Sequence, residues 1–445
     1  MLFKTIQQNI FNIFILTLAI FLSTFFWIKN TPYPANLNWD LLEHQTLINE
    51  LFKGNFSYFT SNISDTFTFN GYPPTFHIIF ALIQKIFFIG EYGEVKFWYI
   101  SGFIQYFISL ILQVLLTYKI TKSVKIVVYT LIIKVFIFES FVAYTSWFLI
   151  PQTFASDIVL LGFLYFYSIK DKALTARSLL PLYTIFIFGF FCHYIIGAVG
   201  LGAITGTVIF TKYFNDKTKK YILIGLGVIT ILMVLLNKYL SFNPLGSDES
   251  LAYLLTFKEK LFYFNIWYGY FVYLFGLTGL VYAFYKKLYV FLFILLGLMF
   301  GSLYPFPYNL KFFVILHYFI NITCGLGVYF IFKNIKSPLL LYTAKLVLVF
   351  SLFYVYFFNI AWFKNSASNI GENISGHFNS VEINAAKILK ESYKGQKVLI
   401  ISDPATQYVA EAFSGLNSQG GQYMNQPTRD ILKQVNKEPN ISNIK

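Results

Sequence analysis

The chain has 445 residues, of which 57% are hydrophobic, 21% aromatic and only 12% charged, with a formal net charge of +14. Because soluble domains carry about 25% charged residues, this composition excludes an ordinary soluble globular protein and predicts a bundle of bilayer-spanning helices. The excess lysines lie in short segments between apolar runs, which argues against a nucleic-acid partner. Cys192 and Cys324 both lie within apolar runs, so neither a disulfide framework nor a zinc site is expected.

About eleven segments approach the roughly 20 apolar residues that a spanning helix needs. They are 9–28, 98–118, 126–143, 148–169, 180–195, 197–211, 221–240, 262–285, 288–305, 312–332 and 338–363. The first is expected to be a retained helix, since no small-residue cleavage site accompanies it. The apolar stretch 178–211 is too long for one helix, and we divide it at the His193–Gly197 turn.

The segment 73–89 decides the topology. It opens with two prolines and contains His77, Gln84 and Lys85. If it lies on the membrane surface, all the Lys- and Arg-rich loops fall on one side, as the positive-inside rule requires. Those loops contain Lys119, Lys122 and Lys125; Lys170, Lys172 and Arg177; Lys212, Lys217, Lys219 and Lys220; Lys286 and Lys287; and Lys333 and Lys336. The sequence therefore predicts an interfacial helix at 73–89 and a cytoplasmic N-terminus.

Two regions are then expected outside the membrane. A long first outer loop, 29–97, belongs to a transmembrane region, 1–363, and should hold interfacial helices. The more polar C-terminal region, 364–445, is expected to form a small extracytoplasmic α/β unit. Its pattern predicts a helix at 380–392, a strand at Lys397–Ser402, an Asp403-Pro404 turn and a helix at 405–413. The expected fold class is an all-α polytopic membrane protein that carries this unit.

Asp40, Glu43 and His44 follow the first predicted span and share one edge of a helix. A carboxylate there could act as a general base on an acceptor hydroxyl, or could hold a divalent cation together with His44. The alternative is that Asp40 is a helix N-cap and that the others are solvated. His77 follows the sequence GYPP, and it either faces lipid headgroups or binds a substrate phosphate.

Ionisable residues within the predicted spans are costly at membrane depth and often mark function. Glu139 lies near the outer end of the third span, and Lys134 is expected to pair with it or with a lipid phosphate. Asp157, two turns into the fourth span, could be a second acid or a metal ligand, or could be satisfied by neighbouring helices. His193 lies at an outer turn and is either a substrate contact or a satisfied interfacial residue.

Two further residues lie in the tenth predicted span. Lys311, at its outer end after YPFPYN, could face an anionic substrate. His317 lies deeper, where a lone histidine is more often satisfied by its neighbours. Asp403-Pro404 is explained by an N-cap aspartate followed by proline at the first helical position.

The combination resembles the GT-C superfamily of polytopic glycosyltransferases, which includes oligosaccharyltransferase catalytic subunits, protein mannosyltransferases and aminoarabinose transferases. The resemblance rests on Asp40 through LINELFKG, on GYPPTFH at 71–77 with the helix after it, and on ISDPATQYVAEAF-SG at 402–415. It implies that Asp40 is the acidic residue that follows the first span. It also implies sugar transfer from a lipid-linked donor at the outer face, with Lys85, Lys311 or His77 at the donor phosphate.

Departures from the family pattern narrow the expected reaction. The outer loop before the fourth span reads SWFLIPQT and has no acid, so Glu139 or Asp157 would have to serve as the second carboxylate. This leaves open a divalent cation, Mg or Mn, whose ligands would come from Asp40, His44 and Asp157. The WWD-type signature of oligosaccharyltransferases is missing, so transfer of a single sugar from a polyprenyl-phosphate donor is expected rather than protein N-glycosylation.

The sequence thus predicts a multi-pass cell-membrane glycosyltransferase whose partners are a lipid-linked sugar donor and membrane lipids, with no nucleic acid. The alternatives are a transporter or flippase, or a polymerase for lipid-linked glycans. A transporter would favour internal repeats and helices broken at the midplane, and the sequence has no such repeat. A non-catalytic scaffold would not need Asp40, Glu139 and Asp157 to converge in one outer-facing cavity.

Overall fold

The computed structural model describes most of the predicted bundle. It covers residues 44–45, 47–49, 51–52, 54, 73–87, 95–136, 149–170, 176–210, 216–239, 258, 272–304, 310–369, 380–394, 399–400, 410, 413–414 and 417–418. The helices are α3 (Thr75–Ile86), α4 (Val95–Thr121), α5 (Val124–Phe136), α6 (Pro151–Ile169), α7 (Ala176–Cys192), α8 (Tyr194–Phe210), α9 (Asp216–Tyr239), the π-helix η2 (Val272–Gly276), α12 (Leu277–Tyr285), α13 (Tyr289–Leu303), α14 (Leu310–Asn334), α15 (Pro338–Asn369) and α16 (Ser380–Ser392). Two short strands, β1 (Leu399–Ile400) and β2 (Asn417–Ser418), pair in parallel.

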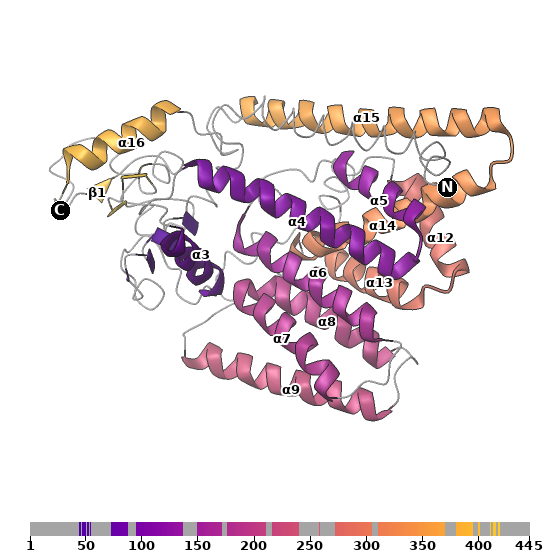
Figure 1. Cartoon of the computed structure of the whole chain (residues 1–445), viewed down its shortest axis with the longest axis horizontal. Coiled ribbons are helices and arrows are strands. Elements are labelled where there is room, and N and C mark those ends of the chain that lie inside the picture. The colour runs from indigo at the N-terminus through magenta and orange to yellow at the C-terminus, as the bar shows by residue number, and fades with distance from the viewer. Residues whose placement is uncertain are drawn as a thin grey trace.

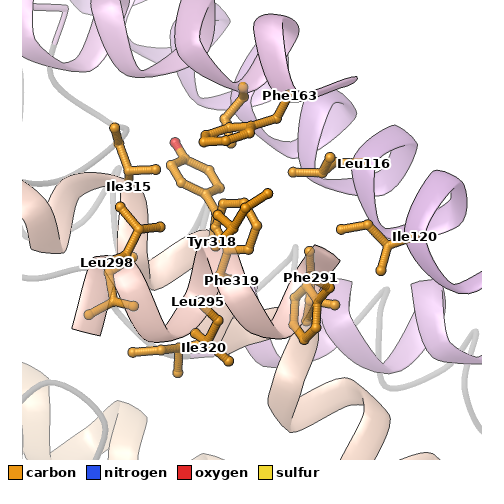
Figure 2. Close-up of a cluster of buried hydrophobic side chains, with 14 of the residues drawn as sticks. Leu116, Ile120, Phe163, Phe291, Leu295, Leu298, Ile315, Tyr318, Phe319 and Ile320 are labelled. Atoms are coloured by element: carbon orange, nitrogen blue, oxygen red, sulfur yellow. The ribbon is translucent and has the colours of Figure 1, made fainter. Parts of the chain in front are cut away.

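Helix α14 forms the centre of the bundle. It packs against α5, α12, α13, η2, α8 and α6. Phe319 of α14 is fully buried, and its ring meets Phe163 of α6 edge-on at a centroid distance of 5.2 Å and stacks on Phe291 of α13 at 5.9 Å. Figure 2 shows these rings in one cluster with Tyr318 and aliphatic side chains of α4 and α13. This packing fixes α6, α13 and α14 relative to one another.

Helices α12 and α14 approach closely enough for backbone contact. A Cβ atom added at Gly279 would clash with the carbonyl oxygen of Thr323, and one added at Gly327 would clash with the carbonyl oxygen of Phe275. Only glycine fits at these crossings, as is common where membrane helices pack through small residues.

The predicted helices agree well with the observed ones. The break proposed between 180–195 and 197–211 is found at His193, between α7 and α8. The predicted helix 380–392 matches α16, and β1 lies within the predicted strand. Of the described residues, three stretches are long and apolar enough to cross a membrane: Ile104–Thr121, Pro151–Ile169 and Lys311–Asn334. Shorter apolar helices accompany them, so the total of eleven spans stays a prediction, and the first predicted span, 9–28, lies outside the described residues.

Helix α3 is too short to span a bilayer. Its 12 residues rise about 18 Å, against a hydrocarbon core of about 30 Å. One face, which includes Phe76, His77 and Phe80, is buried against α6 and α7, while Leu82 and Ile86 on the other face are exposed. This agrees with the prediction that 73–89 does not span.

The two ends of the bundle differ in composition. Figure 1 places α3, α16 and β1 towards one end, and the turns α4–α5, α12–α13 and α14–α15 at the opposite end. Those turns contain Lys122, Lys286, Lys287 and Lys336. We refer to them as the α3 end and the lysine-rich end. The predicted grouping of these basic turns at one end is therefore confirmed, whereas their cytoplasmic location stays a prediction.

Candidate functional site

Five polar side chains from separate parts of the chain meet at the α3 end. They are His44, His77, Gln152, His193 and Lys311, and we call them the histidine–lysine cluster. Gln152 lies in the first turn of α6, after Pro151 begins the helix, and Lys311 lies in the first turn of α14. His193 forms the break between α7 and α8. Its backbone N–H donates to Gly189, and its Nδ1 accepts from the N–H of Ile196 at 3.4 Å, capping α8.

His44 and His77 form a buried pair. Nδ1 of His44 and Nε2 of His77 are 3.0 Å apart, and the two residues are 3% and 0% exposed. The helical segment that contains His44 runs parallel to α3, because a second contact joins Gln84 to Asn49 at 3.2 Å further along both segments. His77 therefore does not face lipid headgroups, and the sequence alternative that placed it there is wrong.

Aromatic packing holds α3 against the bundle. The ring of Phe154, on α6, lies 5.7 Å from the ring of Phe76 and 5.8 Å from that of Phe80, both in edge-to-face geometry. Such pairs contribute about 0.5–1.5 kcal/mol beyond their buried area. Since Phe76 directly precedes His77, this contact also fixes the position of the histidine pair.

Burial, with the charge of Lys311 at His44 and His193, keeps the three histidines neutral. Burial, followed by the positive charge of Lys311, lowers the pKa of His44 from 6.5 to about 3. Burial, followed by the neighbouring His44, lowers the pKa of His77 well below 6.5. Burial, Lys311 and His44, in that order, lower the pKa of His193 in the same direction. At neutral pH, the positive charge of the cluster is thus that of Lys311.

Lys311 itself is partly buried. Its Nζ donates a hydrogen bond to Oε1 of Gln152, which is 3% exposed. A half-desolvated ammonium group beside neutral imidazoles favours an anion, because its charge is poorly screened and each imidazole can donate one N–H.

Asp157 lies in the first two turns of α6, as Gln152 does, and is hydrogen bonded to a residue of α4. Nε2 of Gln105 donates to its Oδ2 at 2.6 Å and approaches the carbonyl oxygen of Thr153 at 3.4 Å. Asp157 is 6% exposed. Oδ2 of Asp157 is thus bound by a neighbouring helix, as one of the two sequence alternatives expects, and its role at the site stays a prediction.

Other predicted site residues lie elsewhere. Lys85 lies two turns beyond His77, with its Nζ 5.8 Å from the centre of the Phe52 ring, so it is not part of the cluster. Lys134 is 1% exposed and lies 4.2 Å over the Tyr318 ring, which excludes contact with a lipid phosphate. His317 is buried, with Nδ1 3.3 Å from the carbonyl oxygen of Phe313, as expected for a satisfied histidine. Asp40, Glu43, Glu139 and Asp403-Pro404 lie outside the described residues.

Sequence reasoning missed Gln105 and Gln152. Both are amides within apolar runs, and both are 3% exposed. At membrane depth, uncharged polar residues as well as ionisable ones often mark function. The position of Gln152 directly after Pro151, at the start of a span, is the feature that could have identified it.

The described residues do not form a metal site. No group of three or more His, Cys, Asp or Glu side chains within them could hold a metal ion. His44 is hydrogen bonded to His77, and Asp157 to Gln105. We therefore derive no step through a metal.

Comparison with known proteins finds similarity in structure only. No family model matches the chain, and no curated protein matches it in sequence. Solved structures of an archaeal oligosaccharyltransferase from Archaeoglobus fulgidus do match. The structure with a tethered acceptor peptide aligns over 95% of this chain at 12% identity, with a TM-score of 0.58. The AglB complex with an inhibitory peptide and a dolichol-phosphate aligns over 94% of this chain at 13% identity, with a TM-score of 0.57.

A complex of the same oligosaccharyltransferase with Zn and sulfate aligns over 92% of the chain at 13% identity and a TM-score of 0.57. The chain spans 62–65% of the length of these structures. At this identity, the similarity establishes the fold and leaves the activity open. The chain therefore shares its fold with this archaeal oligosaccharyltransferase, as the resemblance to the GT-C superfamily predicts.

Proposed function

We propose that this protein is an integral membrane glycosyltransferase that moves a sugar from a polyprenyl-phosphate donor to an acceptor at the outer face of the membrane. The observation that carries the proposal is the meeting of Lys311, Gln152 and three histidines at one end of a GT-C bundle. That end also holds α3 and, in the predicted topology, faces outward. The dolichol-phosphate complex of a similarly folded protein supports a lipid phosphate as the ligand class.

The cluster suits the phosphate of such a donor. Lys311 supplies a fixed positive charge, and Gln152 holds its ammonium group through a hydrogen bond. The buried imidazoles can donate N–H groups to phosphate oxygens. A phosphate dianion would also favour protonation of His44 or His193, because an adjacent negative charge stabilises the imidazolium form.

In the proposed reaction, an acceptor oxygen attacks the anomeric carbon of the donor sugar. The bond between that carbon and the phosphate oxygen breaks, and the phosphate leaves with the bonding electrons. Asp40 takes the acceptor proton as general base, and Lys311 stabilises the charge that develops on the leaving phosphate. Glu43 and Glu139 are proposed to assist Asp40, and Asp157 to help position the substrate.

A divalent cation would need three ligands, namely Asp40 together with His44 and Asp157. The Zn and sulfate complex of a similarly folded protein supports testing it. Removing Mg and Mn with EDTA, then adding each back, measures whether transfer depends on the ion. Unchanged transfer after EDTA treatment would remove the metal from the proposal.

Binding of the donor phosphate can be tested with purified protein in detergent. Polyprenyl phosphate is expected to raise the midpoint of thermal unfolding, whereas polyprenol, which lacks the phosphate, is not. Lys311→Met should abolish the shift. Lys333→Met is the matched control, since Lys333 lies in the last turn of the same helix at the opposite end. Equal shifts in both variants would refute the assignment of the cluster.

Catalysis is tested separately, because a flippase would also bind a polyprenyl phosphate. Membranes with the protein should release radiolabelled sugar from polyprenyl-phosphate donor into a lipid-free or protein-bound acceptor fraction. In the host, deletion of the gene should cause the lipid-linked sugar to accumulate. Donor that is moved across the membrane without loss of its sugar would instead favour the flippase.

A further inference from the structure

A second polar group lies deep in the bundle, away from the histidine–lysine cluster. Helix α4 carries Gln105, Ser109, Gln113 and Thr117 at intervals of four residues, and all are between 0% and 3% exposed. Residues four apart share one face of a helix. Helix α4 therefore presents a continuous buried polar stripe in an otherwise apolar span, and its first residue, Gln105, is linked to the mechanism proposed above only through its hydrogen bond to Asp157.

The stripe meets polar residues of α14 and α5. Gln113 donates from Nε2 to the carbonyl oxygen of Tyr318 at 3.2 Å, and Ser109 hydrogen bonds to the Tyr318 hydroxyl. Lys134 of α5 lies over the ring of the same tyrosine. Thr130, one turn before Lys134 on α5, lies against Gly325, two turns beyond Tyr318 on α14, where an added Cβ would clash with the Thr130 Oγ1. Asn321 lies between these two crossings on α14.

Four polar atoms at this crossing have no hydrogen-bond partner within the part of the chain that the structure describes. They are Oε1 of Gln113, Oγ1 of Thr130, and both Oδ1 and Nδ2 of Asn321, and their residues are at most 1% exposed. Each buried and unsatisfied polar atom costs about 1–3 kcal/mol. Within a bilayer, bulk water cannot satisfy these atoms. If the site were dry, the unsatisfied atoms of three residues from three helices would therefore destabilise the folded protein by several kcal/mol in total.

We propose that Gln113, Thr130 and Asn321 bind ordered water between α4, α5 and α14. The set includes acceptors, a donor and a hydroxyl that can do either, and a buried water typically makes about three hydrogen bonds to such groups. Immobilising a water costs at most about 2 kcal/mol, which is less than several unsatisfied groups cost together. The bound water lies beside the Lys134 and Tyr318 pair and solvates its charged end. This inference rests on the bundle alone and is independent of the proposed function.

The test is X-ray radiolytic hydroxyl labelling of the full-length protein in detergent, since radicals formed from bound water oxidise the side chains beside it. Tyr318 is fully buried, yet is expected to be oxidised. Its neighbour Phe319, equally buried but within the apolar cluster, should stay unmodified. Tyr393, which is 39% exposed, serves as the dose control.

The matched variant is Asn321→Leu, which keeps the side-chain size and removes both polar atoms. It is expected to reduce labelling of Tyr318 at least threefold and to leave Tyr393 unchanged. Asn321→Ser, which keeps a hydroxyl, should retain much of the labelling. The proposal is overturned if Tyr318 stays unlabelled in the wild-type protein, or if Asn321→Leu is labelled as strongly. The first measurement needs no variant to fold.

Discussion

The histidine–lysine cluster and the buried crossing of α4, α5 and α14 both place polar side chains inside an apolar bundle. At the α3 end, titratable groups converge from four distant parts of the chain, and the pKa values of the histidines are lowered. At the crossing, three of the residues are amides and a hydroxyl with no charge to lose. The histidine–lysine cluster can bind an anion and can change its protonation with pH. The amides and the hydroxyl at the crossing can only bind neutral hydrogen-bonding groups such as water. The difference is one of composition, since four titratable side chains converge at the cluster, whereas the crossing holds amides and a hydroxyl beside one lysine, Lys134.

The largest effect is expected from removing Asp40, the general base of the reaction proposed for the histidine–lysine cluster. Asp40→Asn keeps the size of the side chain and removes its carboxylate. We expect transfer to fall about 100-fold or more, as general bases usually contribute 10²–10⁴, while the midpoint of thermal unfolding stays the same. The measurement is sugar transfer from radiolabelled donor, and near-normal turnover would reduce Asp40 to a helix cap.

The second largest effect is expected in the dependence of stability on pH, which should differ between variants of the histidine–lysine cluster and variants of the buried crossing. The histidines remain neutral in the folded protein, but gain a proton near pH 6.5 when it unfolds, so the unfolded state binds more protons. Stability is therefore complete above about pH 6.5, and falls by about 1.4 kcal/mol per pH unit for each histidine as the pH decreases towards the folded pKa, about 3 for His44.

Thermal unfolding measured between pH 7.5 and 5 should show this fall, and His44→Gln should make it shallower. Asn321→Leu, at the crossing of α4, α5 and α14, removes no titratable group and should leave the dependence of the unfolding midpoint on pH unchanged. An unfolding midpoint that does not change over this range would contradict the assignment of neutral histidines.

A smaller effect is expected from the contact between His44 and His77. Replacing His77 by Phe should cost about 1–3 kcal/mol, because it removes the hydrogen bond between the two buried imidazoles. The double replacement of His44 and His77 by Phe should cost less than the sum of the two single ones. Chemical unfolding of the four proteins gives the coupling, and additive costs would show that the pair does not interact.

The smallest effect is expected at Lys85, which lies near the same end but outside the cluster. Lys85→Met should leave both binding of polyprenyl phosphate and stability within about 0.5 kcal/mol of the wild-type values, as is usual for residues away from special features. Binding measured by the thermal shift provides the readout. A loss comparable to that of Lys311→Met would extend the site along α3.

The sequence alone determined the membrane class, the helices and the break at His193. Apolar length and the positions of lysine are local properties, so they can be read from the chain without knowing what packs against what. The positions of the basic loops also predicted that 73–89 does not span, and the 12-residue α3 agrees. His44, His77, His193 and Lys311 were also recognised individually as candidates.

Only the tertiary structure decided which candidates meet. The cluster joins residues up to 267 positions apart, from His44 to Lys311, and their proximity depends on how α3, α6, α7, α8 and α14 pack. It brought in Gln152, placed Lys85 outside, and showed Asp157 bound to Gln105. It also showed Lys134 inside the bundle over Tyr318. The physical reason is that burial and pairing are properties of the packed helices, because the free energy of a buried polar group depends on its neighbours in space rather than in sequence.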